Sequence, residues 1–149
     1  IAMIPTRIPK IKGFTLNEFI NLSCYNKQNA DSDKALKKLA LSHLADRDIS
    51  TLSDGEFQKG TIAAAIAKGA EIILMDEPTA FLDTENRRNV LSTLRKLCEE
   101  TGTAVIFSSH DLYEALETCN KVIALGADRQ CHISSENLKD TISAIFSKD

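Results

Sequence analysis

Two adjacent carboxylates, Asp76 and Glu77, follow an unbroken apolar run at residues 72–75 and precede Pro78. An apolar run of this length that ends in turn chemistry is typical of a fully buried strand in a parallel sheet. Ligands of such sheets bind at the carboxyl ends of the strands, where both acids would lie. Because two buried carboxylates need a compensating cation, we expect one to hold Mg²⁺, directly or through water, and the other to orient or deprotonate a water. These residues alone leave a second interpretation open, in which two solvated acids simply precede a turn.

Two other stretches could take part in phosphate chemistry. Ser53 and Gly55 stand where a helix N-terminus would offer backbone N–H groups and its positive dipole end to an anion, and Gly55 would let a phosphate approach the backbone. A plain serine N-cap is the alternative for this stretch. His110 follows the apolar run at residues 103–107, so it too would lie at a strand's carboxyl end. A neutral imidazole there could hydrogen-bond a γ-phosphate and the attacking water, although a lone histidine is more often structural.

The elements that would position these residues follow from hydrophobic periodicity and from capping residues. Residues 15–18 match a capping box at the start of a short helix. An alanine-rich helix follows residues 52–56, and Gly69 is well placed to end it. The other expected elements are strands at residues 1–4, 103–107 and 121–125, a helix capped by Asp31 or Ser32 with Leu36, Leu39, Ala40 and Leu44 on one face, a helix from Asp83 or Thr84 to Gly102, a helix with Leu112, Ala115, Leu116 and Cys119, and a last helix that begins at Ser134 or Ser135.

The order of these elements predicts the fold class. From residue 70 onward, strands and helices alternate, which is the pattern of an α/β domain with a parallel sheet, whereas residues 10–68 are expected to be mainly helical. The 149 residues, 43% apolar and 26% charged, fit one domain with a real core. The net charge of −3 favours no nucleic-acid surface, and no apolar run approaches the ~20 residues that span a bilayer. The four cysteines lack zinc-like spacing, so we expect reduced thiols in a cytosolic protein.

Taken in this order and spacing, the motifs resemble those of the ATP-binding cassette ATPases, and the resemblance covers nearly the whole chain. It implies a partial nucleotide-binding domain over residues 1–149, with a helical subdomain at residues 10–68 and part of a P-loop NTPase (RecA-like) core at residues 70–149. By resemblance, the motifs are the signature motif at residues 52–56, the Walker B strand at residues 72–76, the catalytic glutamate Glu77, the D-loop at residues 80–83 and the switch histidine His110.

The resemblance also implies cofactors and partners. ATP and Mg²⁺ would be bound, with Asp76 holding the metal ion and Glu77 and His110 acting on the water and the γ-phosphate. The signature motif would meet the ATP of a second cassette in a head-to-tail dimer, and Asp83 would act across that dimer or simply cap its helix. An integral membrane permease would dock on residues 10–68, which would place the protein in the cytoplasm, peripherally at the inner face of the cell membrane.

Three positions depart from the common pattern of the family. Asp54 and Glu56 replace a glycine and the glutamine of Leu-Ser-Gly-Gly-Gln, and each adds an acid near a phosphate site. Thr6 stands where the glutamine of the Q-loop is usual, and it could contact Mg²⁺ or water only at shorter reach. Together with residues 76–83, these variants look most like importers of iron–siderophore, haem or cobalamin.

The sequence contains no G-x-x-x-x-G-K motif, because none of its six glycines is followed by lysine. The family has this loop upstream of the region that begins at Ile1, so we expect a C-terminal part of a cassette that hydrolyses ATP in the full-length protein and is inactive alone. Two alternatives remain: a soluble cassette ATPase that acts on DNA, ribosomes or protein complexes, and a non-catalytic interaction module.

Overall fold

A computed structural model describes residues 1–24, 31–111, 116–125 and 131–135, and the chain divides into two compact units, residues 1–108 and 109–149. A parallel sheet forms the base of the first unit. Its strands are β1 (Ala2–Ile4), β2 (Ile72–Met75) and β3 (Ala104–Phe107), in the order β1-β2-β3. All three strands therefore end at the same edge of the sheet, and the predicted α/β class with parallel strands is confirmed.

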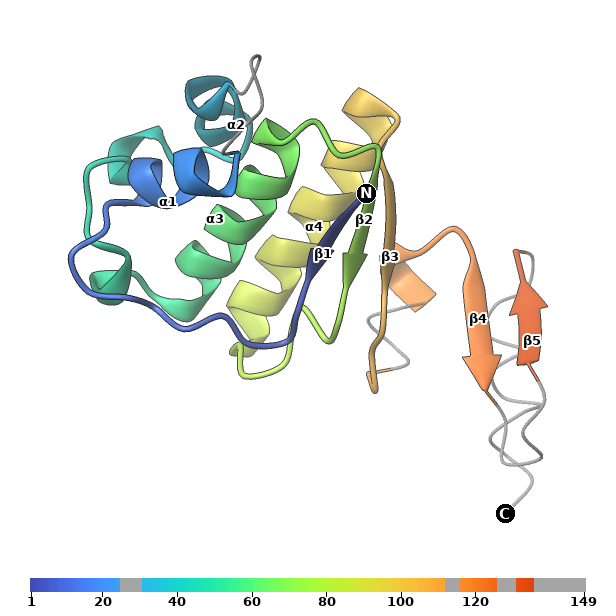
Figure 1. The fold of residues 1–149 in the computed structure, drawn as a ribbon. Coiled ribbons are helices and arrows are strands. Elements are labelled where there is room, and N and C mark those ends of the chain that lie inside the picture. Colours follow the sequence, from blue (N-terminus) through green and yellow to red (C-terminus); the bar gives the residue numbers. More distant parts are fainter. Residues whose placement is uncertain (25–30, 112–115, 126–130, 136–149) are drawn as a thin grey trace. The chain divides into compact units, whose positions relative to one another are not determined.

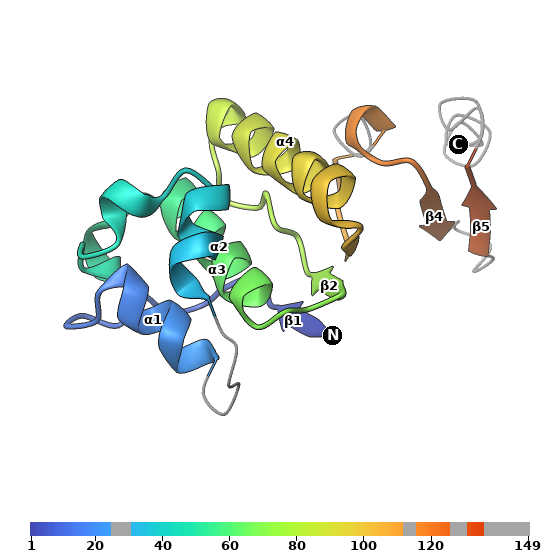
Figure 2. The same ribbon diagram turned by 90° about the horizontal axis from the view of Figure 1, so that it is seen from above.

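The helices of the first unit lie on one side of this sheet (Figures 1 and 2). Helix α3 lies between the sheet and the two short helices α1 and α2, and α4 packs beside it. Buried contact on nearly every side explains why α3 is rich in alanine and glycine, since larger side chains would hold the layers apart. The helices are α1 (Leu16–Ser23), α2 (Ser32–Lys38), α3 (Asp54–Ala67) and α4 (Thr84–Thr101), with short 3-10 turns at Ser42–Leu44 and Ile49–Thr51.

The helix starts are fixed by capping side chains. The predicted capping box at the start of α1 is present, with Thr15 and Glu18 exchanging hydrogen bonds. Ser53 and Glu56 form a second capping box at the start of α3. Asp83 caps α4, as predicted. Each cap satisfies backbone N–H groups that have no partner inside the helix.

Helix α2 is shorter than its hydrophobic pattern predicts. The pattern continues to Leu44, but the helix ends at Lys38 and Ala40 adopts a left-handed conformation with φ 56°. The N–H of Leu41 donates to the carbonyl of Leu36, and that of Ala40 to Lys37, which is a Schellman motif. This stop was missed because alanine replaces the glycine that usually marks it, while Leu41 and Leu44 preserve the apolar spacing.

The second unit differs from the predicted continuation of the parallel sheet. Strand β4 (Val122–Leu125) pairs antiparallel with β5 (Cys131–Ser134), which the sequence analysis did not predict. Ser134, expected as a possible helix cap, is the last residue of β5. The expected last helix at residues 136–149 lies outside the described residues, as do Leu112 and Ala115. No disulfide joins the four cysteines, all of which lie among the described residues. Within the described ranges, no helix is long and apolar enough to cross a membrane.

The capping carboxylates predict how stability depends on pH. Backbone N–H donors hold the pKa of Glu18, Glu56 and Asp83 below their ordinary values; the donors are Thr15, Ser53 and Asn86. A carboxyl whose pKa is lower in the folded state binds protons more readily in the unfolded chain, so its stabilisation is present above the unfolded pKa and is lost as pH falls. The thermal midpoint of the chain should stay level from about pH 7 to about pH 5 and fall below about pH 4.3, near the ordinary glutamate value.

Circular dichroism melts between about pH 7 and about pH 3 would measure this dependence. The variant Glu18→Gln lacks one of these carboxylates, so its midpoint should decline less steeply with acidification than that of the unmodified chain. A midpoint that stays constant over the whole acid range would contradict the assignment of these bonds.

Candidate functional site

The carboxylate of Asp76 lies between two hydroxyls at the carboxyl edge of the sheet. Thr6 Oγ1 donates to Asp76 Oδ2 at 2.5 Å, and Ser108 Oγ donates to Asp76 Oδ1 at 2.7 Å. Thr6 follows β1, Asp76 follows β2 and Ser108 follows β3, so the ends of three parallel strands meet at one carboxylate. The sheet register explains this meeting, because Met75 is level with both Ile4 and Phe107.

Glu77 is fixed through its backbone at the same edge. Its N–H donates to Ser108 Oγ at 2.9 Å, and its carbonyl accepts from Ala80 N at 3.0 Å. Its φ of 46° lies in the left-handed region, which is uncommon for a residue with a side chain. Such a conformation persists only where the surrounding bonds impose it, and it is frequent at functional sites. The side chain is half-buried, so it remains accessible to a ligand at the strand end.

This edge offers the oxygen donors that Mg²⁺ prefers. Hydroxyl and carboxylate oxygens of Thr6, Asp76 and Ser108 converge there, and hard oxygen ligands suit a small divalent cation. In proteins Mg²⁺ commonly uses one or two carboxylates and keeps several waters, so a single well-held carboxylate with Glu77 beside it fits the ion. Among the described residues no cluster of three or more histidine, cysteine or acidic side chains forms a site for a tightly bound metal.

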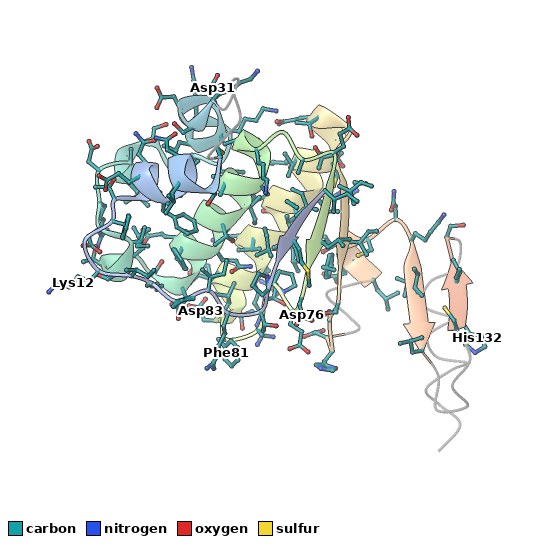
Figure 3. The ribbon with its side chains drawn as sticks, viewed as in Figure 1. Lys12, Asp31, Asp76, Phe81, Asp83 and His132 are labelled. Atoms are coloured by element: carbon teal, nitrogen blue, oxygen red, sulfur yellow. The ribbon has the colours of Figure 1, made fainter. Side chains whose placement is uncertain are left out.

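The turn after β2 leads from Glu77 to the start of α4. Phe81 has a φ of 69° and is 63% exposed, and the guanidinium carbon of Arg7 lies 4.0 Å from the centre of its ring. Such a cation–π contact is worth about 0.5–1 kcal/mol at an exposed site. Asp83 then accepts hydrogen bonds from both the backbone N and the side-chain Nδ2 of Asn86, each at 2.8 Å. Asp76, Phe81 and Asp83 lie at the same end of the first unit, opposite Asp31 (Figure 3).

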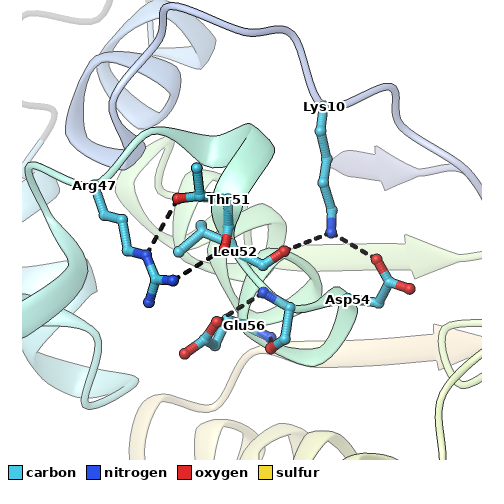
Figure 4. A network of polar contacts seen from close by, with 7 residues as sticks. Lys10, Arg47, Thr51, Leu52, Asp54 and Glu56 are labelled. Atoms are coloured by element: carbon cyan, nitrogen blue, oxygen red, sulfur yellow. Dashed lines mark hydrogen bonds and ion pairs between the residues drawn. The ribbon is translucent and has the colours of Figure 1, made fainter.

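The stretch at residues 52–56 leads from the 3-10 turn at Ile49–Thr51 into the start of α3. Ser53 is the N-cap, and its N–H and hydroxyl are both engaged with Glu56 in the capping box. The carboxylate of Asp54 pairs with Lys10 at 2.6 Å (Figure 4). The two acids that depart from the common pattern are thus held by a serine N–H and by a lysine. Asp54 and Glu56 therefore each have a partner within the protein.

Gly55 lies against the start of α4. A Cβ placed at this position would overlap Asn86 Oδ1 and would lie 2.7 Å from Asn86 Cγ. Since Asn86 also binds Asp83, one side chain joins the glycine of the first turn of α3 to the cap of α4. The structure therefore brings together Thr6, Asp76 and Glu77 in one group, and Gly55 and Asp83 in another.

His110 belongs to the second unit and is exposed. It lies between Ser109 and Asp111, where Asp111 N donates to Ser109 Oγ at 3.0 Å. Its proposed action on a γ-phosphate stays a prediction. Three residues that the sequence analysis did not select contact the predicted site residues: Ser108, Lys10 and Asn86. For Ser108 a signal was present, since a serine directly after the strand at residues 103–107 must lie beside the end of the neighbouring strand.

Comparison with known sequences gives consistent likenesses. The profile of the ABC transporter family matches residues 1–80. The phosphonates import ATP-binding protein PhnC of Shigella dysenteriae is 37% identical over 116 residues, which are 78% of this chain and 42% of that protein. PhnC of Escherichia coli K12 is 39% identical over 100 residues, or 67% of this chain and 37% of that protein. The chain thus spans about two fifths of the length of these curated relatives.

Solved structures show the same fold. An inward-facing ABC transporter described as of metal-chelate type has a TM-score of 0.85 at 26% identity, covering 98% of this chain and 64% of that chain. CbiO1 of Clostridium perfringens, part of the transporter complex CbiONQ, has a TM-score of 0.83 at 21% identity, covering 95% and 59%. These likenesses confirm the predicted fold class, part of a P-loop NTPase core with the helical subdomain of a cassette.

Proposed function

Because this chain belongs to the ABC transporter family, we propose that the full-length protein that contains it is the ATP-binding and ATP-hydrolysing subunit of an importer. The observation that supports this most directly is the group at the carboxyl edge of the sheet. Asp76 is held there by two hydroxyls, and Glu77 is held beside it by its own backbone. A phosphoryl-transfer site needs a metal-binding carboxylate and a second group that orients water, and this pair offers both.

The roles of the residues follow from these contacts. Asp76, with Thr6, would hold Mg²⁺, which neutralises charge on the phosphate oxygens when bound. The hydroxyls of Thr6 and Ser108 fix both oxygens of the Asp76 carboxylate, which prepares it for a ligand. Glu77 orients or deprotonates the attacking water, because it directly follows Asp76 at the end of β2 and so lies beside the proposed metal site. His110 would hydrogen-bond the γ-phosphate.

The residues at the starts of α3 and α4 contact the ATP that is bound by a second copy of the cassette. Ser53, Asp54, Gly55 and Glu56 form a helix N-terminus, which suits a phosphate because of its N–H groups and dipole. Asp83 lies at the start of α4 and is linked to Gly55 through Asn86. In a head-to-tail homodimer, these residues contact ATP bound by the opposite subunit. The hydrolysis cycle then closes and opens the dimer at the cytoplasmic face of the membrane.

The similar proteins point to two classes of cargo for the proposed importer. The similarity to an ABC transporter of metal-chelate type, over 98% of this chain, favours an iron–siderophore, haem or cobalamin importer. The 37% identity to a phosphonate import subunit favours a small phosphorus-containing anion instead. We expect the cargo to be distinguished by the membrane subunit that binds this cassette, so identifying that subunit would decide between the two classes.

The experiment that tests this function uses the full-length protein purified with its membrane subunit. Residues 10–68 expose the apolar side chains of Ile11, Phe14 and Leu22, of which Leu22 is 61% exposed. A photo-crosslinking residue at Leu22 should attach to the membrane subunit, and the complex should release phosphate from Mg-ATP.

A crosslinker at Arg88, an exposed position of α4, serves as the matched control and should give little product with the membrane subunit. Crosslinks from residues 84–149 alone would contradict docking on residues 10–68. A complex that releases no phosphate from Mg-ATP would contradict the proposed ATPase.

A further inference from the structure

Lys10 links the segment after β1 to the first turn of α3. Its Nζ donates to the carbonyl of Leu52 at 2.7 Å and pairs with Asp54 Oδ1 at 2.6 Å (Figure 4). The same ammonium lies 5.6 Å from the centre of the Phe57 ring. The Lys10 side chain is 23% exposed, whereas that of Asp54 is 67% exposed. The lysine is thus the better buried partner, and its charge lies beside a carbonyl, a carboxylate and an aromatic ring of residues 52–57.

The turn that Lys10 contacts carries negative charges that would repel a phosphate. Asp54 and Glu56 place two carboxylates at the helix end where a phosphate of ATP would bind, and like charges at a binding site cost affinity. Glu56 is occupied by the N–H of Ser53, which keeps its pKa low and its charge in place. The negative charge of Asp54 is offset only if a cation stays beside it, and Lys10 supplies that cation.

A second cation holds the turn from the other side. Arg47 donates through Nε to Thr51 Oγ1 at 3.2 Å and through Nη2 to the Thr51 carbonyl at 3.1 Å. Lys10 and Arg47 approach the turn from opposite sides (Figure 4). Arg47 binds the residue before Leu52 and its charge helps to lower the pKa of Glu56, whereas Lys10 pairs directly with Asp54. The segment that contains Lys10 also contains Thr6, which binds Asp76, so it contacts both parts of the site.

We propose that Lys10 is a positioning residue for nucleotide binding, which fixes the turn at residues 52–56 and offsets the charge of Asp54 so that the turn accepts a nucleotide phosphate. This inference rests on the proposed ATPase function. The lysine itself does not contact the nucleotide. Its effect on binding acts through Asp54 and through the carbonyl of Leu52.

The test is steady-state ATP hydrolysis by the full-length protein with Lys10→Met, which keeps the apolar stem and removes the charge. The KM for ATP should rise about tenfold, because an uncompensated carboxylate then faces the phosphates, while kcat should change less than about twofold. The rise in KM should shrink as ionic strength increases from about 0.05 M to about 0.5 M, since salt screens exposed charges. A purely structural contact would show no such dependence.

Matched variants separate the cause. Lys12→Met removes a lysine of the same segment and should leave KM unchanged, and Lys10→Arg should keep KM within about threefold. Asp54→Asn alone should lower KM slightly, and in that background Lys10→Met should raise KM by less than about twofold, because the charge that it offset is gone. The inference would be overturned if Lys10→Met raised KM equally with and without the Asp54→Asn substitution. It would also be overturned if Lys10→Met left KM at the value of the unmodified protein. If the unmodified protein hydrolysed no ATP, the proposed ATPase function itself would be overturned. Failure of the proposed function is thus seen in the unmodified protein, and failure of the role of Lys10 only in the variants.

Discussion

The full-length protein with Glu77→Gln should bind Mg-ATP as well as the unmodified protein, while its phosphate release falls by about a hundredfold to ten-thousandfold. Glutamine keeps the size of the side chain and its oxygen acceptor but cannot take a proton from water. Nucleotide binding depends on other groups, so ATP should accumulate on the variant. In the proposed head-to-tail arrangement, the ATP-bound dimer should then persist and be detectable by sedimentation.

The substitution Glu77→Gln tests the carboxylate itself, because it keeps the backbone contacts at this position. Two of the bonds that hold Glu77 are made by its backbone, from its N–H to Ser108 and from Ala80 to its carbonyl, and glutamine retains both. Glu71 offers a matched control, because it is exposed and precedes the other end of β2. Glu71→Gln should leave phosphate release unchanged. Near-normal turnover in Glu77→Gln would show that another group activates the water.

Local sequence signals were sufficient where neighbouring residues determine the structure. The apolar run at residues 72–75 predicted β2, although only Ile73 and Met75 are buried and not the whole strand as expected, and the capping side chains predicted the starts of α1 and α4. Gly69 and Gly102, with φ values of 65° and 69°, follow α3 and α4 as predicted. The parallel pairing of β2 with β3 followed from the alternation of elements after residue 70, whereas the place of Thr6 near the Mg²⁺ site was expected only from the family resemblance.

Contacts between distant segments could not be predicted in the same way. Lys10 and Asp54 are 44 residues apart, and nothing in either local sequence indicates the other. The charge of Asp54 was an unexplained departure until its partner was found 2.6 Å away. The strand β5 was missed for a related reason, because its pairing with β4 determines it. The end of α2 was missed for a local reason, because Ala40 takes the left-handed position at which a glycine would have marked the stop.

Gly55→Ala should both destabilise the protein and reduce ATP hydrolysis. The added methyl group would overlap Asn86 Oδ1 and would lie 3.1 Å from Asn86 Cβ, so a rotation of the amide alone cannot relieve the contact. Overpacking of this kind typically costs about 1–3 kcal/mol. Because Asn86 Nδ2 also binds Asp83, its displacement should disturb the start of α4 and the turn of α3 together. We expect phosphate release to fall by about tenfold or more.

Gly60→Ala separates this effect from the general cost of filling a glycine in α3. Its added Cβ would meet Leu16 Cδ1 at 2.7 Å, but that atom is the end of a flexible side chain, and alanine favours the helix by about 1 kcal/mol. Chemical denaturation should therefore show little loss of stability for Gly60→Ala, with near-normal phosphate release. Adding Asn86→Ala to Gly55→Ala removes the amide, which should restore part of the stability. The same change removes the side-chain donor to Asp83, so hydrolysis should stay low. Full recovery of hydrolysis in that double variant would show that Asn86 only fills space between the two helices.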